Sequence, residues 1–133
     1  MILATLLLLA ADPALPPVVL EGDYEFQTVQ MADGHPACTE HWTFGSEGTV
    51  VMHSGEETAT KKFHIEDGNV LVTTEGVNDG KPDCTGRTYP GTEPDMRLML
   101  AAGVRDDIMV GVPKAAADGG MVLDAIGRLI KQP

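Results

Sequence analysis

Positively charged and aromatic residues are both scarce in this chain. Lysine and arginine number 9 against 20 aspartates and glutamates, a formal net charge of −11, and aromatic residues make up 5%. Phosphate backbones and anionic lipid surfaces repel such a charge, which disfavours a nucleic-acid partner and leaves a basic protein, a cation or a neutral ligand. With so few aromatic rings, valine, leucine, isoleucine and methionine are expected to fill the interior.

No apolar run reaches the roughly 20 residues that a membrane-spanning helix needs, so no stable membrane span is expected. Residues 1–11 instead contain a run of ten apolar or small residues, Ile2 to Ala11, which ends at Asp12-Pro13. A short apolar core with a small-residue exit is typical of a signal peptide, although no lysine or arginine precedes this one. We therefore expect export to the periplasm or the extracellular space, with a buried strand or helix as the alternative.

Short apolar runs separated by glycine-rich turns dominate the rest of the chain, a pattern typical of meandering strands. After a proline-rich linker at residues 12–20, residues 21–133 are predicted to form a single domain. The expected fold is all-β, a small antiparallel β-barrel or barrel-like sandwich of about eight strands. Strands are predicted at residues 24–31, 38–44, 49–54, 58–65, 70–74, 97–101 and 108–112.

Two segments depart from this pattern. Residues 76–94 are rich in glycine and proline and keep no period, so we expect a long loop there. Residues 121–131 allow two structures, because their apolar side chains lie at helical spacing while Gly127 can turn a hairpin. We favour the hairpin over a short C-terminal helix, because closing a sheet removes an exposed edge.

The chain has only two cysteines, Cys38 and Cys84. In an oxidising compartment two cysteines in one small domain usually pair, so we predict a disulfide that joins the start of a strand to the long loop. The alternative is a catalytic thiol at Cys38 assisted by His41. On a strand that spacing places the two side chains on opposite faces, which favours the disulfide.

Two short segments resemble a known family. Gly22-Asp23-Tyr24 resembles the G-x-W entry of lipocalin-like barrels, with Tyr24 in the place of the tryptophan. The run Trp42-Thr43-Phe44 followed by Gly48 is similar to the strand-turn pattern of small exported barrels of this type. The resemblance implies a binding role, since such families include fatty-acid and haem carriers and small periplasmic inhibitors of proteases and lysozymes.

A histidine-based metal site is one possible source of chemistry, with Glu40, His41 and His53 as candidate ligands. Their spacing matches none of the zinc motifs H-E-x-x-H or H-x-x-E-H. If residues 46–47 form a two-residue turn, Glu40 lies opposite His53 and His41 lies on the other face. A three-ligand site then needs a further residue such as His35, and surface histidines are the simpler interpretation.

Other catalytic signatures are missing from the sequence. It contains no G-x-S-x-G elbow, no P-loop and no G-x-G-x-x-G, and its only serines are Ser46 and Ser54, in predicted turns. Glu56 and Glu57 are adjacent, so they face opposite ways on a strand and are interpreted as a solvated acidic turn rather than a catalytic pair.

We therefore expect a non-enzymatic binding protein without a cofactor. A small apolar ligand inside the barrel is predicted to contact Trp42, Phe44, Phe63 and Met96. The first alternative is a periplasmic inhibitor, for example of a lysozyme or a protease, which binds a basic envelope protein through a protruding loop at residues 77–94. A metal-dependent enzyme or metal-binding protein that uses the histidines is the second alternative.

Overall fold

The computed structural model describes residues 17–28, 38–103 and 106–133. These residues form nine strands and no helix, so the predicted all-β fold is confirmed. The strands are β1 (Gly22–Thr28), β2 (Thr39–Phe44), β3 (Thr49–Ser54), β4 (Glu57–Glu66), β5 (Val70–Asn78), β6 (Thr92–Glu93), β7 (Met96–Ala102), β8 (Asp107–Ala115) and β9 (Met121–Lys131).

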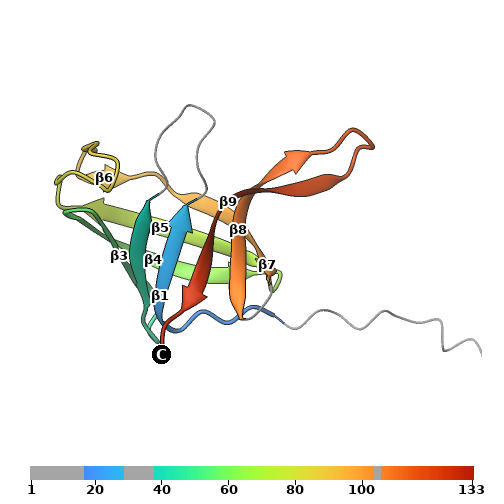
Figure 1. The fold of residues 1–133 in the computed structure, drawn as a ribbon, viewed down its shortest axis with the longest axis horizontal. Helices are drawn as coiled ribbons and strands as arrows, with labels where there is room; N and C mark the ends of the chain where they lie inside the picture. Colours follow the sequence, from blue (N-terminus) through green and yellow to red (C-terminus); the bar gives the residue numbers. More distant parts are fainter. Residues whose placement is uncertain (1–16, 29–37, 104–105) are drawn as a thin grey trace, which may run out of the picture.

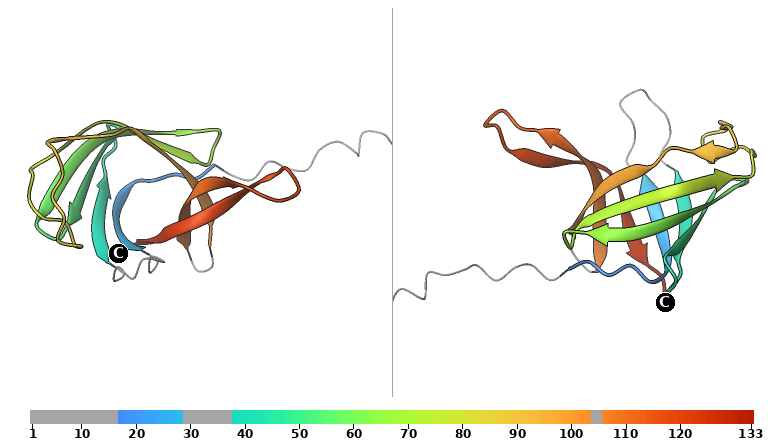
Figure 2. Two further views of the ribbon diagram at one scale, coloured as in Figure 1. Left: turned by 90° about the horizontal axis from the view of Figure 1, so that it is seen from above. Right: turned by 180° about the vertical axis from the view of Figure 1, so that it is seen from behind.

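All strand pairings are antiparallel, and they run around a ring (Figure 1). The order is β4-β3-β2-β1-β9-β8-β7-β5, and β5 pairs back with β4 to close the ring. β6 lies outside this ring and, among the nine described strands, pairs only with the end of β5. Figure 2 shows the strands curving around a common interior. The ring leaves few sheet edges exposed to solvent.

Along the parts of β1–β4 that form the ring, inward side chains alternate with outward ones, as the period of two predicts. Five of the six aromatic residues gather there, together with aliphatic side chains such as Val50, Leu71 and Leu129. The aromatic contacts pair Tyr24 with Phe44, Phe26 with Trp42, Trp42 with Phe44, and Phe44 with Phe63. Aliphatic residues therefore fill only part of the interior. A series of aromatic rings in contact with one another occupies its centre.

The β2–β3 hairpin is shifted by one residue from the predicted register. The backbone N–H of Gly45 donates to the carbonyl of Thr49 at 2.8 Å, and Gly48 has a φ of 82°. These features define a three-residue loop at 46–48 that ends in a left-handed glycine, not the predicted two-residue turn. As a result His41 lies opposite His53.

The C-terminal segment is neither the predicted hairpin nor a short helix. Residues 121–131 form the single strand β9, which pairs with β8 in a long hairpin that turns at residues 116–120. Gly127 does not turn the chain. A Cβ atom there would lie 2.6 Å from the ring of Phe26 and 2.5 Å from the carbonyl oxygen of Gln27, so glycine is required by the close approach of β1.

Replacing Gly127 by alanine is expected to lower the free energy of unfolding by about 2 kcal/mol, because the added methyl group has to displace the β1 backbone or the Phe26 ring. Gly91→Ala is the matched control, because nothing lies within 4 Å of a Cβ atom at Gly91. Urea unfolding followed by tryptophan fluorescence measures both variants. Equal stability of the two variants would contradict the close approach.

The predicted long loop is shorter than expected. β5 continues to Asn78, and Thr92 and Glu93 pair back with Val77 and Gly76, so the loop covers residues 79–91. Its backbone bonds to the start of β4, where the N–H of Glu56 donates to the carbonyl of Pro82 at 2.9 Å. The loop therefore lies against the ring instead of protruding from it.

The end of the expected linker also packs on the ring. Leu20 is buried in the core, Val18 packs against it, and the N–H of Val18 donates to the carbonyl of Gly68 at 2.8 Å. Residues 1–11, which we interpret as a signal peptide, lie outside the described residues. In the ranges that are described, no helix is long and apolar enough to cross a membrane.

Candidate functional site

A disulfide joins Cys38 and Cys84, as predicted, with Cα atoms 5.9 Å apart. It links the residue before β2 to the loop at 79–91 across a sequence separation of 46 residues. The backbone N–H of Cys84 also donates to Oγ of Ser54 at 3.1 Å, at the end of β3. The loop is thus fixed to the end of the ring where β2 and β4 begin.

A pocket of about 260 Å³ opens at this end. We call it the mouth pocket. Its apolar side chains are Trp42, Met52, Ala59 and Met96, and its polar side chains are Glu40, Ser54, Glu57, Lys61, Tyr89 and Glu93. The centre of the ring is filled by the aromatic chain, so the mouth pocket is a space above a solid core.

Strand alternation brings the charged residues of the mouth pocket inside. On β2, Glu40 shares the inward face with Trp42, as its spacing predicts. On β4, the inward face carries Glu57, Ala59 and Lys61, all buried. The burial of Glu57 overturns the interpretation of Glu56 and Glu57 as a solvated acidic turn, since only Glu56 is exposed.

Lys61 and Glu93 form a buried ion pair in the pocket wall. The distance from Nζ of Lys61 to Oε2 of Glu93 is 2.6 Å, and their side chains are 4% and 15% exposed. The short strand β6 positions Glu93 by pairing it with Gly76. Removing one partner of such a buried pair leaves the other charge buried and uncompensated, which strongly destabilises the fold.

Among the polar side chains of the mouth pocket, Glu57 is unusual because it is buried and one of its oxygens lacks a hydrogen-bond partner among the described residues. The residue is 7% exposed, and its Oε2 is buried with no hydrogen-bond partner among the described residues. Burial raises the pKa of the Glu57 carboxyl above its usual range, and the negative charges of Glu93, Asp83, Glu40 and Asp79 raise the pKa further. The mouth pocket therefore holds an excess of negative charge and an unsatisfied carboxylate oxygen.

The four predicted ligand-binding residues separate into two pairs. Trp42 and Met96 line the mouth pocket. Phe44 and Phe63 belong to the core instead, with ring centroids 5.0 Å apart, and neither is among the residues that line the pocket. Glu40, expected as a metal ligand, is the third sequence candidate that reaches the pocket, where its Oε1 accepts a 2.9 Å bond from Nε1 of Trp42.

The predicted metal ligands do not come together. Glu40 faces the interior, while His41 and His53 are exposed on the outer face. Within the described ranges no group of three His, Cys, Asp or Glu side chains could hold a metal ion. The register shift at the 46–48 loop is the reason, since it places the two histidines opposite each other and away from Glu40. His35 lies outside the described residues.

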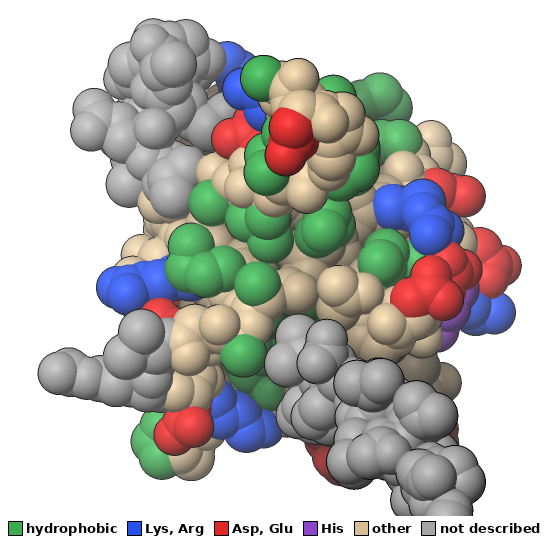
Figure 3. All heavy atoms as spheres, turned by 90° about the vertical axis from the view of Figure 1, so that its right-hand side faces the viewer, with side chains coloured by type: hydrophobic (Ala, Val, Ile, Leu, Met, Phe, Trp, Pro, Cys, Tyr) green, Lys and Arg blue, Asp and Glu red, His purple; other side chains and the backbone are tan. Residues whose placement is uncertain are grey.

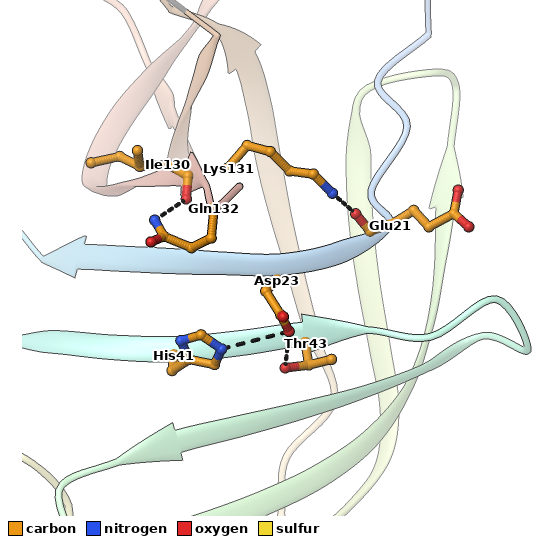
Figure 4. A network of polar contacts seen from close by, with 7 residues as sticks. All are labelled: Glu21, Asp23, His41, Thr43, Ile130, Lys131 and Gln132. Atoms are coloured by element: carbon orange, nitrogen blue, oxygen red, sulfur yellow. Dashed lines mark hydrogen bonds and ion pairs between the residues drawn. The ribbon is translucent and has the colours of Figure 1, made fainter.

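His41 belongs to a surface network of polar contacts (Figure 4). Its Nε2 lies 3.6 Å from Oδ1 of Asp23, which also accepts a 2.8 Å bond from Oγ1 of Thr43. The bond from Thr43 and the proximity of His41 lower the pKa of the Asp23 carboxyl against the opposing effect of desolvation. Nearby, Nζ of Lys131 donates to the carbonyl of Glu21. These contacts join β2 to β1 and the end of β9 to the residue before β1, which is a structural role.

A second hollow, of about 560 Å³, lies at the opposite end of the ring, between residues 17–21 and the β7–β8 connection. It is larger than the mouth pocket. Two of its lining residues, Gly103 and Asp106, flank residues 104–105, which lie outside the described part of the chain.

The outer half of the β8–β9 hairpin projects beyond the ring, a feature that the sequence did not reveal (Figure 1). Pairing of β8 with β7 ends at Gly111, and pairing of β9 with β1 ends at Gly127. The projecting part exposes Val112, Met121 and Val122. Figure 3 shows hydrophobic side chains gathered on the face from which the hairpin extends.

The chain matches no family model, no curated protein and no solved structure. A function therefore has to be argued from the geometry of the described residues. The resemblance of Gly22-Asp23-Tyr24 to the lipocalin-like entry stays a prediction. In the structure Tyr24 is buried near the start of β1. The centroid of its ring lies 5.5 Å from the centroid of the Phe44 ring.

Proposed function

We propose that this chain is an exported, non-enzymatic binding protein that holds a small ligand in the mouth pocket. The observation that carries this proposal is an open space of about 260 Å³ above a filled core, lined by Trp42, Met52 and Met96. An apolar wall with a few convergent polar groups is the usual composition of a small-molecule site. The volume suits a ligand smaller than a drug-sized molecule, for which pockets of roughly 300–1,000 Å³ are typical.

The arrangement of polar groups supports binding rather than catalysis. Ser54 accepts the backbone N–H of Cys84, and the described histidines His41, His53 and His64 are exposed on strands rather than part of the mouth pocket. Within the described residues, the pocket thus contains no serine or cysteine nucleophile hydrogen-bonded to a histidine base, the arrangement that covalent catalysis uses.

The Cys38–Cys84 disulfide supports the exported location, because disulfides persist in oxidising compartments. Export by a signal peptide at residues 1–11 and a lipocalin-like ancestry belong to the same proposal. Both agree with a small barrel-like domain whose binding site lies at one open end.

Methyl NMR tests the proposal, because the methionines provide reporters on both sides of one strand. Met96 lines the mouth pocket, whereas Met99 lies on the outer side of β7 in a separate surface hollow. Titration with benzyl alcohol and benzylamine is expected to shift the Met52 and Met96 methyl signals saturably and to leave Met99 unchanged. The emission of Trp42, the only tryptophan, should change in parallel. Absence of a saturable shift with either probe would overturn the proposal.

Docking of a protein partner is a second candidate function, favoured by one observation. The projecting hairpin exposes Val112, Met121 and Val122 on a segment whose two edges pair with no other strand of the described residues. The loop at 79–91, expected to act in this way, is tied to the ring and is a poorer candidate. In the same titrations, silent Met52 and Met96 signals would leave the hairpin as the better supported site.

A further inference from the structure

The charges of the mouth pocket are unbalanced. Three carboxylates, Glu40, Glu57 and Glu93, face one ammonium group, that of Lys61. Lys61 is bound to Glu93 at 2.6 Å, and one oxygen of Glu40 is occupied by the indole N–H of Trp42. The described residues therefore supply no cation at hydrogen-bond distance from Oε2 of Glu57.

A buried carboxylate oxygen without a donor is costly. An unsatisfied buried polar group destabilises a fold by about 1–3 kcal/mol, and more when it is charged. Native structures contain few such groups, and each calls for a specific explanation. The other carboxylates around Glu57 increase the strain, because their repulsion is one of the causes that raise its pKa. A ligand that brings a positive charge and an N–H donor would relieve both effects.

The apolar wall limits what kind of cation fits. Trp42, Met52 and Met96 lie in the same pocket as Glu57, so a ligand there contacts hydrocarbon and carboxylate together. A bare metal ion would leave this wall in contact with solvent, and within the described residues no three acidic, histidine or cysteine side chains are placed to ligate one. An aromatic or thioether wall beside a carboxylate instead suits an alkyl or aryl ammonium group.

We propose that the ligand of the mouth pocket is a small organic cation whose ammonium group donates to Glu57 and Glu40 and whose hydrocarbon part packs on Trp42, Met52 and Met96. This inference rests on the proposed function, which concerns the pocket alone. It adds the chemical class of the ligand and assigns to Glu57 the central role in selecting it.

Three probes of similar size and different charge test the inference: benzylamine, benzyl alcohol and benzoate. The cation is expected to bind at least about tenfold more tightly than the alcohol, equivalent to about 1.4 kcal/mol. Benzoate is expected to give no saturable shift of the Met52 and Met96 methyl signals. If the alcohol binds as tightly as the amine, the inference is overturned while the proposed function stands. If none of the three binds, both are overturned.

The Glu57→Gln variant tests the role of that side chain. It should weaken benzylamine about tenfold and leave benzyl alcohol unchanged, because only the cation loses its charged partner. Glu56→Gln is the matched control, since Glu56 is the adjacent residue, is exposed and loses the same charge. Equal weakening in the two variants would show a long-range charge effect and contradict the assignment.

Folding of the Glu57→Gln variant is checked by circular dichroism and by the unchanged Met99 methyl signal. Removal of an uncompensated buried charge is not expected to unfold the protein. Should the variant fail to fold, Glu40→Gln provides the second measurement, because Glu40 faces the same pocket from β2. Either variant would contradict the proposal if its affinity for benzylamine equalled that of the native chain.

Discussion

Replacing Cys38 and Cys84 together by alanine is expected to lower the free energy of unfolding by about 4 kcal/mol. The bridge closes a sequence separation of 46 residues, so its loss returns a large conformational entropy to the unfolded chain. It also frees the loop at 79–91, which carries Tyr89 over the mouth pocket. Urea unfolding at equilibrium, with the native chain under oxidising conditions as reference, measures the difference.

The native chain treated with a reductant is the control for this variant, since it loses the bridge but keeps both side chains. The two are expected to agree within about 0.5 kcal/mol, because errors of comparisons between such variants are typically a few tenths of a kcal/mol. If the free energy of unfolding falls by less than about 1 kcal/mol in both the double variant and the reduced native chain, the prediction is wrong. Hydrogen bonds, such as that from Cys84 to Ser54, would then hold the loop without the covalent link.

The Lys61→Met variant is expected to lose about 3 kcal/mol of stability. Lys61 is 4% exposed and, among the described residues, is the only cation that lines the mouth pocket. Its removal leaves Glu93 buried without its partner and adds to the repulsion around Glu57. Thermal and urea unfolding both report the change, which should be larger at neutral pH than in acid, where protonation neutralises the carboxylates.

Two comparisons separate charge from packing in this variant. The Lys61→Met/Glu93→Leu double variant is expected to recover most of the loss, because replacing a whole buried pair by apolar side chains is often neutral. Lys62→Met is the matched surface control. Lys62 pairs with Glu75 at 3.1 Å, but both side chains are about two-thirds exposed, so the change should stay within about 0.5 kcal/mol. A double variant as unstable as Lys61→Met would contradict this account.

The sequence was sufficient for the features that depend on local pattern. The strands predicted at residues 38–44 and 58–65 correspond to β2 and β4, where alternation places Trp42 and Lys61 on the inward face. The cysteine count predicted the disulfide, because two cysteines allow a single pairing. Glycine-rich turns located most strand boundaries, although β6 was missed because a two-residue strand between prolines leaves no periodic signal.

Features that depend on contacts across the ring could not be predicted in the same way. A glycine can mark a turn or a close approach, and only the pairing of β9 with β1 shows which applies at Gly127. Similarly, a two-residue and a three-residue loop differ by one residue, and that residue decides whether His53 lies opposite Glu40 or His41. The sequence does contain an indication that Glu57 is buried. Glu57 lies two residues before Ala59 and four before Lys61, so on a strand it faces the same side as these two buried residues.

The pairing of β1 with β9 has a consequence for how the molecule acquires its shape. These strands come from the two ends of the described chain, and Tyr24 lies opposite Lys131. Contacts between positions so remote in sequence make folding slow, because a large loop has to close before they form. For a chain synthesised from its N-terminus, the ring cannot be completed until β9 has emerged. Until then the edges of β1 and β8 that pair with β9 in the finished ring have no strand beside them.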